Sequence, residues 1–167
     1  MGKLLIITGF IFFVGCSTST TGEITDDNEQ DYSGQVDSRQ DNLAMIFDAV
    51  EVHGKYTSRD SVAAFLCKFD KLPTNYIGKN QGKKIYEEKT GNSFSKWNFN
   101  PWTTIGYMIG GDVFENNEGL LPSGSYHEAD VDYSGANRGT KRLIYQGNCT
   151  IYYTADHYES FKQILFD

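Results

Sequence analysis

The hydrophobic pattern divides the chain into a helical first part and a strand-rich second part. Apolar residues in the segment 57–69 recur three and four positions apart, which predicts a helix with one buried stripe. The members of this stripe are Val62, Phe65, Leu66 and Phe69. Thr57 and Asp60 have the spacing of a capping box, and Pro73 ends the helical pattern. Residues 79–91 predict a second helix, which ends at a glycine.

The second part of the chain has the pattern of short strands. Residues 98–106 show no clear period and are predicted to be irregular. After them come segments that are rich in aromatic and β-branched residues and are separated by Gly, Asn or Ser turns. These segments are 107–114, 125–133, 142–146, 149–154 and 160–166. Helices followed by a run of strands predict an α+β fold with an antiparallel sheet.

The N-terminus has the composition of an export signal. Lys3 precedes an apolar run over residues 4–14, which is too short to span a bilayer as a helix. The letters FVGC that end at Cys16 resemble a bacterial lipobox, so residues 1–16 are predicted to be a signal peptide and Cys16 the lipidated residue. A plain secretory signal that is cleaved is the alternative. Both predict an exported bacterial protein, either secreted or held to a membrane only through this lipid anchor.

A polar acidic segment follows the signal. Residues 17–41 are nearly without aliphatic side chains and are predicted to be a disordered tether, which leaves residues 42–167 as the folded domain. Residues 42–52 fit a short helix or a strand equally well. The formal net charge is −7, but residues 1–54 hold nine of the 22 acidic and two of the 15 basic residues. The rest of the chain is therefore neutral, and its charge does not argue against a nucleic-acid partner.

The cysteines allow one bridge in the exported domain. Disulfides persist in the oxidising compartments to which exported proteins go. If Cys16 is lipidated, Cys67 and Cys149 remain as a pair, and the sequence favours a disulfide between them over two separate buried thiols.

Strand alternation gathers acidic side chains on one face of the segment 125–133. Glu128, Asp130 and Asp132 share that face, and three acids in a row could bind a metal ion. No EF-hand is formed, because Lys141 stands where that loop needs a bidentate glutamate.

Basic residues elsewhere suggest a different chemistry. Arg138 and Arg142 flank a turn, and guanidinium groups suit phosphate. Together with Lys79, Glu128 and His157 they make the set that phosphodiester transfer on RNA requires. One group must take a proton from the 2′-hydroxyl, another must give one to the 5′-oxygen, and fixed cations must stabilise the charge on phosphorus.

Five blocks in order resemble the barnase and binase group of secreted microbial ribonucleases. They are KLPTNYIGK, IGGDVFENNEG, LPSGSYHEADVDY, RGTKRLIYQ and IYYTADHYESF. The resemblance runs from about Ser58 to Leu165. It implies an α+β fold in which N-terminal helices pack on a five-stranded antiparallel sheet. It also implies a guanyl-preferring, metal-independent endoribonuclease that uses no cofactor, and we expect a monomer.

The resemblance assigns roles to the chemical set. It implies that Glu128 is the general base and His157 the general acid of a transesterification that yields a 2′,3′-cyclic phosphate, which is then hydrolysed. Arg138 and Arg142 match the arginines that bind the transferring phosphate, and Lys79 matches the lysine that stabilises the transition state.

The resemblance also assigns a guanine site for single-stranded RNA. It implies that the backbone N–H groups of Asn116 and Asn117 face guanine O6, that the Glu118 carboxylate accepts from guanine N1–H and N2–H, and that Tyr158 lies beside the base. Asn117 departs from the arginine that is usual in the family. This change predicts weaker phosphate binding and a weaker fit to a barstar-like inhibitor protein.

The sequence also allows functions other than an active ribonuclease. A catalytically weakened, surface-tethered RNA- or protein-binding module is the alternative function, and a competition toxin would use the same chemistry.

By analogy with the family, Cys149 takes the place of a large aromatic side chain near the helix that carries Cys67, which again favours their bridge. Trp97 and Trp102 are predicted to serve packing alone.

Overall fold

The computed structural model describes residues 28–166, with side chains described for residues 39–166. The predicted signal peptide of residues 1–16, Cys16 and the first part of the predicted tether lie outside the described residues. Within the described part of the chain, no helix is long and apolar enough to cross a membrane.

Four helices precede the antiparallel part of the sheet. They are α1 (Asn28–Ala49), α2 (Arg59–Phe69), α3 (Lys79–Thr90) and α4 (Pro101–Ile105). Helix α1 begins inside the segment 17–41 that was predicted to be disordered, so prediction and structure differ over residues 28–41. The side chains that anchor α1 come later, because Ile46 and Phe47 pack with Val50 and Phe65.

The observed helix boundaries differ from the predicted ones at two places. Helix α2 is capped by Ser58, whose hydroxyl accepts from the Ser61 N–H at 3.4 Å, and not by a box that starts at Thr57. The segment predicted to be irregular contains α4, in which the Asn100 side chain accepts from the Thr103 N–H at 3.3 Å. Five residues are too few for a hydrophobic period to appear, so only its cap and the proline that follows could have indicated this helix.

One sheet in sequential strand order forms the rest of the fold. The strands are β1 (Tyr76–Ile77), β2 (Met108–Phe114), β3 (Tyr126–Asp130), β4 (Arg142–Gln146), β5 (Thr150–Thr154) and β6 (Lys162–Ile164). Strands β2 to β6 pair antiparallel, as predicted, and the two-residue β1 adds a parallel edge that the sequence pattern did not reveal. The predicted α+β class is confirmed.

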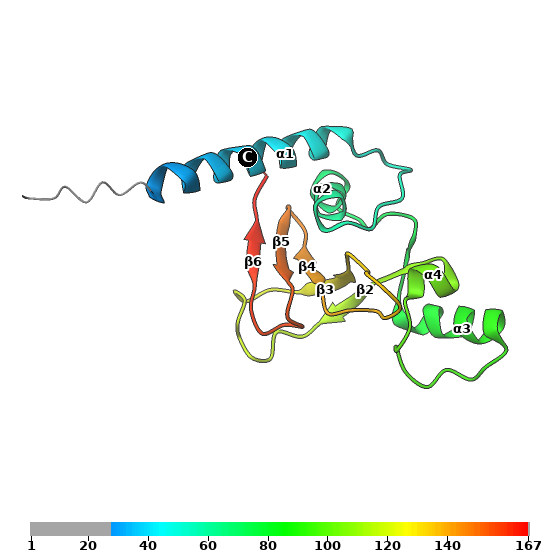
Figure 1. Cartoon of the computed structure of the whole chain (residues 1–167). Helices are drawn as coiled ribbons and strands as arrows, with labels where there is room; N and C mark the ends of the chain where they lie inside the picture. Colours follow the sequence, from blue (N-terminus) through cyan, green and yellow to red (C-terminus); the bar gives the residue numbers. More distant parts are fainter. Residues whose placement is uncertain (1–27, 167) are drawn as a thin grey trace, which may run out of the picture.

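The two faces of the sheet have opposite characters. Helices α1 and α2 lie beside the β4–β6 part of the sheet, and α3 and α4 lie at the β2 side (Figure 1). On the covered face, Ala129, Leu143 and Ile151 join α2 residues in the main core. On the other face, buried polar side chains sit among aromatic ones: Glu128, Asp130, Arg142 and Thr154. Alternation along each strand therefore separates a hydrophobic core from a buried polar face.

A disulfide ties the covered face together. Cys67 on α2 is bonded to Cys149 in the β4–β5 turn, with their Cα atoms 4.2 Å apart and a sequence separation of 82. The bridge closes a long loop, which restricts the unfolded chain more than a short loop would.

Removing this bridge should destabilise the domain without removing its chemistry. We expect the double variant Cys67→Ala/Cys149→Ala to lose about 2–4 kcal/mol of unfolding free energy. Urea denaturation at 25 °C would measure the loss, with reduced wild-type protein as the matched control. The RNA cleavage that the family resemblance implies should persist in the folded variant, because the bridge lies on the face opposite Glu128. An unchanged urea midpoint would contradict this expectation.

Candidate active site

A glycine bulge sets the register of the polar face. Strand β2 shifts register between Gly110 and Asp112, and the intervening Gly111 has φ +90°, a conformation that glycine adopts freely. The shift places Asp112 opposite Glu128 on β3. The next pairing along the sheet places Asp130 opposite Arg142 on β4. Three neighbouring strands thereby present their charged side chains as one continuous patch.

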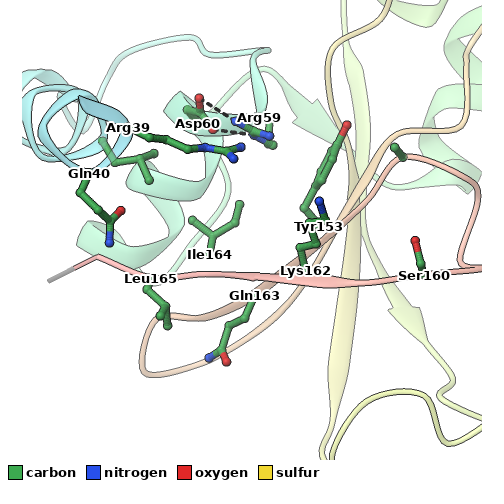
Figure 2. A pocket seen from close by; sticks show the side chains of 12 residues that line it. Arg39, Gln40, Arg59, Asp60, Tyr153, Ser160, Lys162, Gln163, Ile164 and Leu165 are labelled. Carbon is green, nitrogen blue, oxygen red and sulfur yellow. Dashed lines mark hydrogen bonds and ion pairs between the residues drawn. The ribbon is translucent and has the colours of Figure 1, made fainter. Parts of the chain in front are cut away.

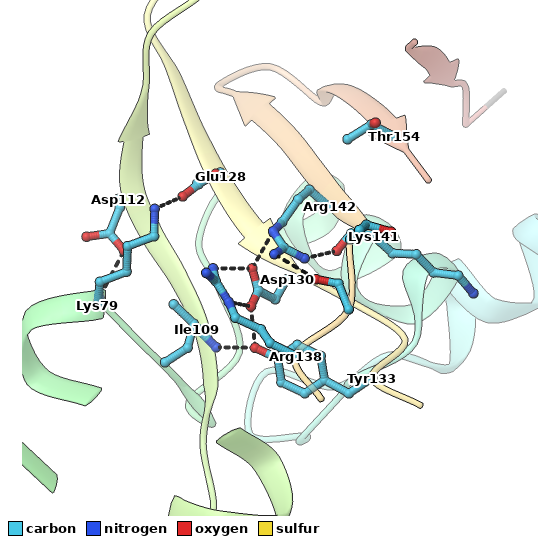
Figure 3. Close-up of polar contacts among 12 residues, drawn as sticks. Lys79, Ile109, Asp112, Glu128, Asp130, Tyr133, Arg138, Lys141, Arg142 and Thr154 are labelled. Carbon is cyan, nitrogen blue, oxygen red and sulfur yellow. Dashed lines mark hydrogen bonds and ion pairs between the residues drawn. The ribbon is translucent and has the colours of Figure 1, made fainter. Parts of the chain in front are cut away.

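The start of α3 meets this patch. The N-cap residue Gly78 has no side chain, and the Asp112 carboxylate takes over the capping role by accepting from the Lys79 N–H at 2.9 Å. This contact holds the first residue of the helix beside β2 and β3. The Lys79 ammonium then donates to Oε1 of Glu128 (Figure 3).

Glu128 is held in its charged form. Its side chain is 6% exposed, and burial by itself would raise its pKa. The hydrogen bonds from Lys79 and from the Tyr158 hydroxyl act in the opposite direction and leave the pKa of Glu128 below its usual value of 4.5. The pKa of Tyr158 is raised by burial and by the same carboxylate, so the phenol keeps its proton. Glu128 is therefore an ionised carboxylate at neutral pH, as a proton acceptor must be.

Asp130 holds both arginines. Its carboxylate is 1% exposed and accepts from Arg138 at two points, Nε at 2.5 Å and Nη2 at 2.8 Å. The Tyr133 hydroxyl also donates to it. Arg142 Nε lies 2.7 Å from Oδ1 without the alignment of a hydrogen bond, so this contact is an ion pair. Two guanidinium groups on one carboxylate leave a net positive charge at this point of the sheet.

The two arginines differ in their access to solvent. The Arg142 side chain is 2% exposed and donates to the carbonyl oxygens of Lys141 at 2.7 Å and Gly139 at 3.1 Å. The Arg138 side chain is 13% exposed and lies nearer to Lys79 in Figure 3. Arg138 is thus the more accessible cation, and Arg142 is the one more deeply built into the sheet.

The acids that could have formed a metal site serve other partners. Glu128 bonds to Lys79, and Asp130 bonds to the arginines. Asp132 accepts from the Arg59 N–H at 2.9 Å and lies 3.8 Å from the Lys141 ammonium. The residues that the structure describes contain no group of three or more His, Cys, Asp or Glu side chains placed to hold a metal ion.

Trp97 supports the cationic side of the patch. The Arg138 guanidinium lies 5.5 Å from the centre of a Trp97 ring, within cation–π range. The same side chain covers Gly82 on α3 so closely that a Cβ there would come within 2.8 Å of it. Trp97 therefore contacts both Arg138 and the helix that carries Lys79, a role beyond the packing that the sequence predicted. The aromatic stretch around it, with Phe94 and Phe99 in contact, was the available signal.

His157 lies in a constrained turn between β5 and β6. His157 and Tyr158 have φ values of 61° and 80°, which are uncommon for residues with a side chain. Asp156 fixes the turn by accepting from Thr154 Oγ1 at 2.7 Å and from the Ser160 N–H at 3.0 Å. The hydrogen bonds from Ser160 and Thr154 lower the pKa of Asp156 to about 2. The rings of His157 and Tyr158 are 4.6 Å apart, so Tyr158 contacts both His157 and Glu128.

The predicted base-reading loop joins the site through an aromatic contact. Asn116 closes this loop, because its side chain donates to the Leu121 carbonyl at 2.7 Å and accepts from the Leu121 N–H at 3.1 Å. The side chains of Asn117 and Glu118 are exposed beside it. At the start of the loop, the Phe114 ring lies 5.3 Å from the Tyr158 ring. The loop and the charged patch are thus linked through Tyr158.

Comparison with known proteins gives a consistent result. The sequence model of the family described as ribonuclease matches residues 60–165. A ribonuclease of Heyndrickxia coagulans is 42% identical over 108 residues, which cover 63% of this chain and 94% of the relative. A ribonuclease of Bacillus intermedius shows the same identity over 108 residues, which cover 63% of each chain. Guanyl-specific ribonuclease St of Saccharopolyspora erythraea is 47% identical over 60 residues, 34% of this chain and 59% of the relative.

These matches agree with the fold and with the ordered blocks of the sequence. The family match contains every strand of the sheet, and it contains the residues around Glu128, Asp130 and His157. This chain therefore belongs to the microbial ribonuclease family and is an endoribonuclease.

Proposed function

We propose that the enzyme cleaves single-stranded RNA on the 3′ side of guanosine by transesterification and then hydrolyses the cyclic product. The observation that carries this proposal is the arrangement around Tyr158. Tyr158 contacts both the ionised Glu128 and the exposed His157. The cations begin at Lys79, which is paired with Glu128. A base, an acid and fixed positive charge are the three parts that the reaction needs.

In the first step, Glu128 takes the proton from the ribose 2′-hydroxyl, and the 2′-oxygen attacks phosphorus. The bond from phosphorus to the 5′-oxygen breaks while His157, as an imidazolium, gives that oxygen a proton. The products are a 2′,3′-cyclic phosphate and a free 5′-hydroxyl. In the second step the roles reverse, since His157 takes a proton from water and Glu128 returns one to the 2′-oxygen. DNA lacks the 2′-hydroxyl and is not a substrate.

The cations stabilise the charge that develops on the phosphoryl oxygens. Lys79 and Arg138 are the more accessible cations, and Arg142 adds positive charge from its buried position in the sheet. Asp130 and Glu128 pair with these cations and Asp112 lies beside Lys79, so the position of the cations, and not a net excess of positive charge, serves the phosphate. Trp97 and Asp130 hold the Arg138 guanidinium in place before substrate arrives, which avoids reorganisation during the reaction.

Guanine recognition is assigned to the loop that Asn116 closes. Backbone N–H groups at Asn116 and Asn117 would face O6, and the Glu118 carboxylate would accept from N1–H and N2–H. The exposed position of Glu118 and the name of the guanyl-specific relative support this assignment. The Asn117 side chain donates to Glu115 at 3.3 Å, so this loop places an amide where an arginine is usual in the family.

The cellular setting is proposed from the N-terminal sequence. Residues 1–16 support export, with Cys16 as the residue that would carry a lipid anchor. An exported ribonuclease must be kept from acting in the cytoplasm, and a barstar-like inhibitor protein is the proposed safeguard. We propose that the enzyme acts as a monomer.

The acid–base pair can be tested by matched substitutions. We expect Glu128→Gln and His157→Gln each to lower kcat/KM on RNA by roughly 10²–10⁴-fold, because each removes one proton-transfer group. The controls are His127→Gln, which changes an exposed histidine of the same strand, and Glu159→Gln. Both controls should cleave at near the wild-type rate. Assays in EDTA should leave wild-type cleavage intact. Near-normal rates for either site variant, or loss of activity in EDTA, would refute the assignment.

Base preference can be tested with dinucleotides. We expect GpX to be cleaved in preference to ApX, and the first product to be guanosine 2′,3′-cyclic phosphate. Glu118→Gln should lower kcat/KM for GpX by roughly 10–100-fold, the effect of losing hydrogen bonds to a charged acceptor. The same change should alter ApX cleavage little, and the control Glu115→Gln should alter neither substrate strongly. Equal rates on GpX and ApX for the wild-type enzyme would show that the loop does not read guanine.

The pH profile should report the environment of Glu128. The base works only when it is deprotonated, so kcat/KM falls as the pH drops through its pKa. Because the pKa of Glu128 is lowered, this acidic limb should lie below the usual glutamate value of 4.5. Lys79→Gln removes a hydrogen bond that lowers this pKa and should move the limb to higher pH, separately from its effect on rate. The control Lys84→Gln, an exposed residue of α3, should not move it. A limb that stays in place in Lys79→Gln would contradict the pairing.

A further inference from the structure

A second basic pocket lies on the other side of the loop that carries His157. It has a volume of about 680 Å³ and is bounded by α1, the start of α2, β5, β6 and the loop between these two strands (Figure 2). Its lining includes three cationic side chains and one aromatic ring: Arg39, Arg59, Lys162 and Tyr153. No step of the proposed reaction uses any of them.

The charge of the pocket is unbalanced. Asp60 is the one acidic side chain among its lining residues, and it is engaged by Arg59, with N–O distances of 2.6 and 3.1 Å. Arg39 and Lys162 form no ion pair with any residue that the structure describes. Figure 2 shows the Arg39 side chain extending towards Arg59, whose guanidinium is paired with Asp60. Arg39 and Lys162 therefore carry charges that no described carboxylate balances, and a bound anion would balance them.

Part of the pocket is already organised. The Arg59 guanidinium lies 5.1 Å from the centre of the Tyr153 ring, and the backbone N–H of Arg59 donates to Asp132 at 2.9 Å. Strand pairing sets Lys162 directly opposite Tyr153, so the lysine and the ring belong to the same side of the sheet. The cations therefore surround a fixed aromatic surface, a combination that suits the phosphates and bases of a single nucleic-acid strand.

The pocket and the site share one loop. Ala155 and Ser160 line the pocket, whereas His157 lies between them in the sequence. Asp156 bonds to Thr154 and to Ser160, which holds both ends of the loop as one unit. In the proposed reaction His157 protonates the leaving 5′-oxygen, so the RNA that continues from that oxygen starts beside this loop. The 3′ part of the substrate therefore leaves the site at the loop that also borders the pocket.

We propose that this pocket is an accessory subsite that binds phosphate groups of the RNA chain on the 3′ side of the cleaved bond. Arg39 and Lys162 supply the charge, and the Arg59–Tyr153 pair supplies the surface for a sugar or base. The subsite takes no part in the chemistry and raises the affinity for long substrates. This inference rests on the proposed direction of cleavage, and it goes beyond the site that performs the reaction.

The test compares three substrates in the full chain: the dinucleotide GpX, an oligonucleotide whose single guanosine has a six-nucleotide 3′ extension, and one with the same extension on the 5′ side. For the wild-type enzyme, kcat/KM should be higher on the 3′-extended substrate than on GpX. The double variant Arg39→Gln/Lys162→Gln should lose about tenfold on the 3′-extended substrate only. Its log–log salt slope there should become shallower by about one to two, because roughly 0.7 counterions are released per phosphate contact on a single strand.

The control variant Lys71→Gln/Lys84→Gln removes two exposed charges elsewhere and should keep the wild-type preference. Equal loss on the 5′- and 3′-extended substrates, equal loss in both double variants, or no gain from a 3′ extension in the wild type would each overturn the subsite. Inhibition of GpX cleavage by inorganic phosphate shows whether free anions act at this pocket or at the catalytic site. If it inhibits GpX cleavage equally in the wild type and the Arg39→Gln/Lys162→Gln variant, that inhibition arises at the catalytic site. Failure of the wild type to cleave GpX at all would instead defeat the proposed function.

Discussion

The buried carboxylate of Asp130 is the contact on which the polar face of the sheet depends. A charge that is 1% exposed is costly unless it is paired and hydrogen-bonded, and Asp130 meets two guanidinium groups and a phenol. The pairing is set by strand register, because β3 and β4 place Asp130 directly opposite Arg142. Arg138 arrives from the following turn and closes the group. Removing the carboxylate would leave two neighbouring cations without a counterion inside the fold, so the geometry of the arginines and the stability of the sheet cannot be separated.

The same arrangement prepares the site electrostatically. Asp130 pairs with both arginines and Glu128 pairs with Lys79, so three cations are held beside a carboxylate that is kept ionised. Capping supplies the remaining order, since Asp112 fixes the first N–H of α3 and with it the position of Lys79. Trp97 contacts both Arg138 and α3 and so links their positions. The cations are held mainly by protein partners, and a phosphate would meet them without further rearrangement of the backbone.

Sequence reasoning succeeded where a pattern had room to repeat. The i, i+3, i+4 stripe of α2 and the alternation in β2 to β6 span enough residues to indicate both the element and its buried side. Helix α4 and strand β1 are too short to show a period, and their existence depends on neighbours that are distant in sequence. The chemical residues were recognised through a family resemblance. That approach could not reveal contacts such as Trp97 with Arg138, which join the segment before α4 to the turn before β4 across about 40 positions.

The turn that carries His157 explains how an exposed acid can remain in position. Two consecutive residues with positive φ are unfavourable, and such strain persists only where the surroundings enforce it. Asp156 provides that enforcement through Thr154 and Ser160, and its pKa of about 2 keeps the carboxylate charged well below neutral pH. At Glu128, burial raises the pKa, but the hydrogen bonds from Lys79 and Tyr158 outweigh it and leave the pKa below its usual value. The charged Asp156 therefore keeps the hydrogen bonds of the turn at moderately acidic pH, and His157 stays where it can act as the acid.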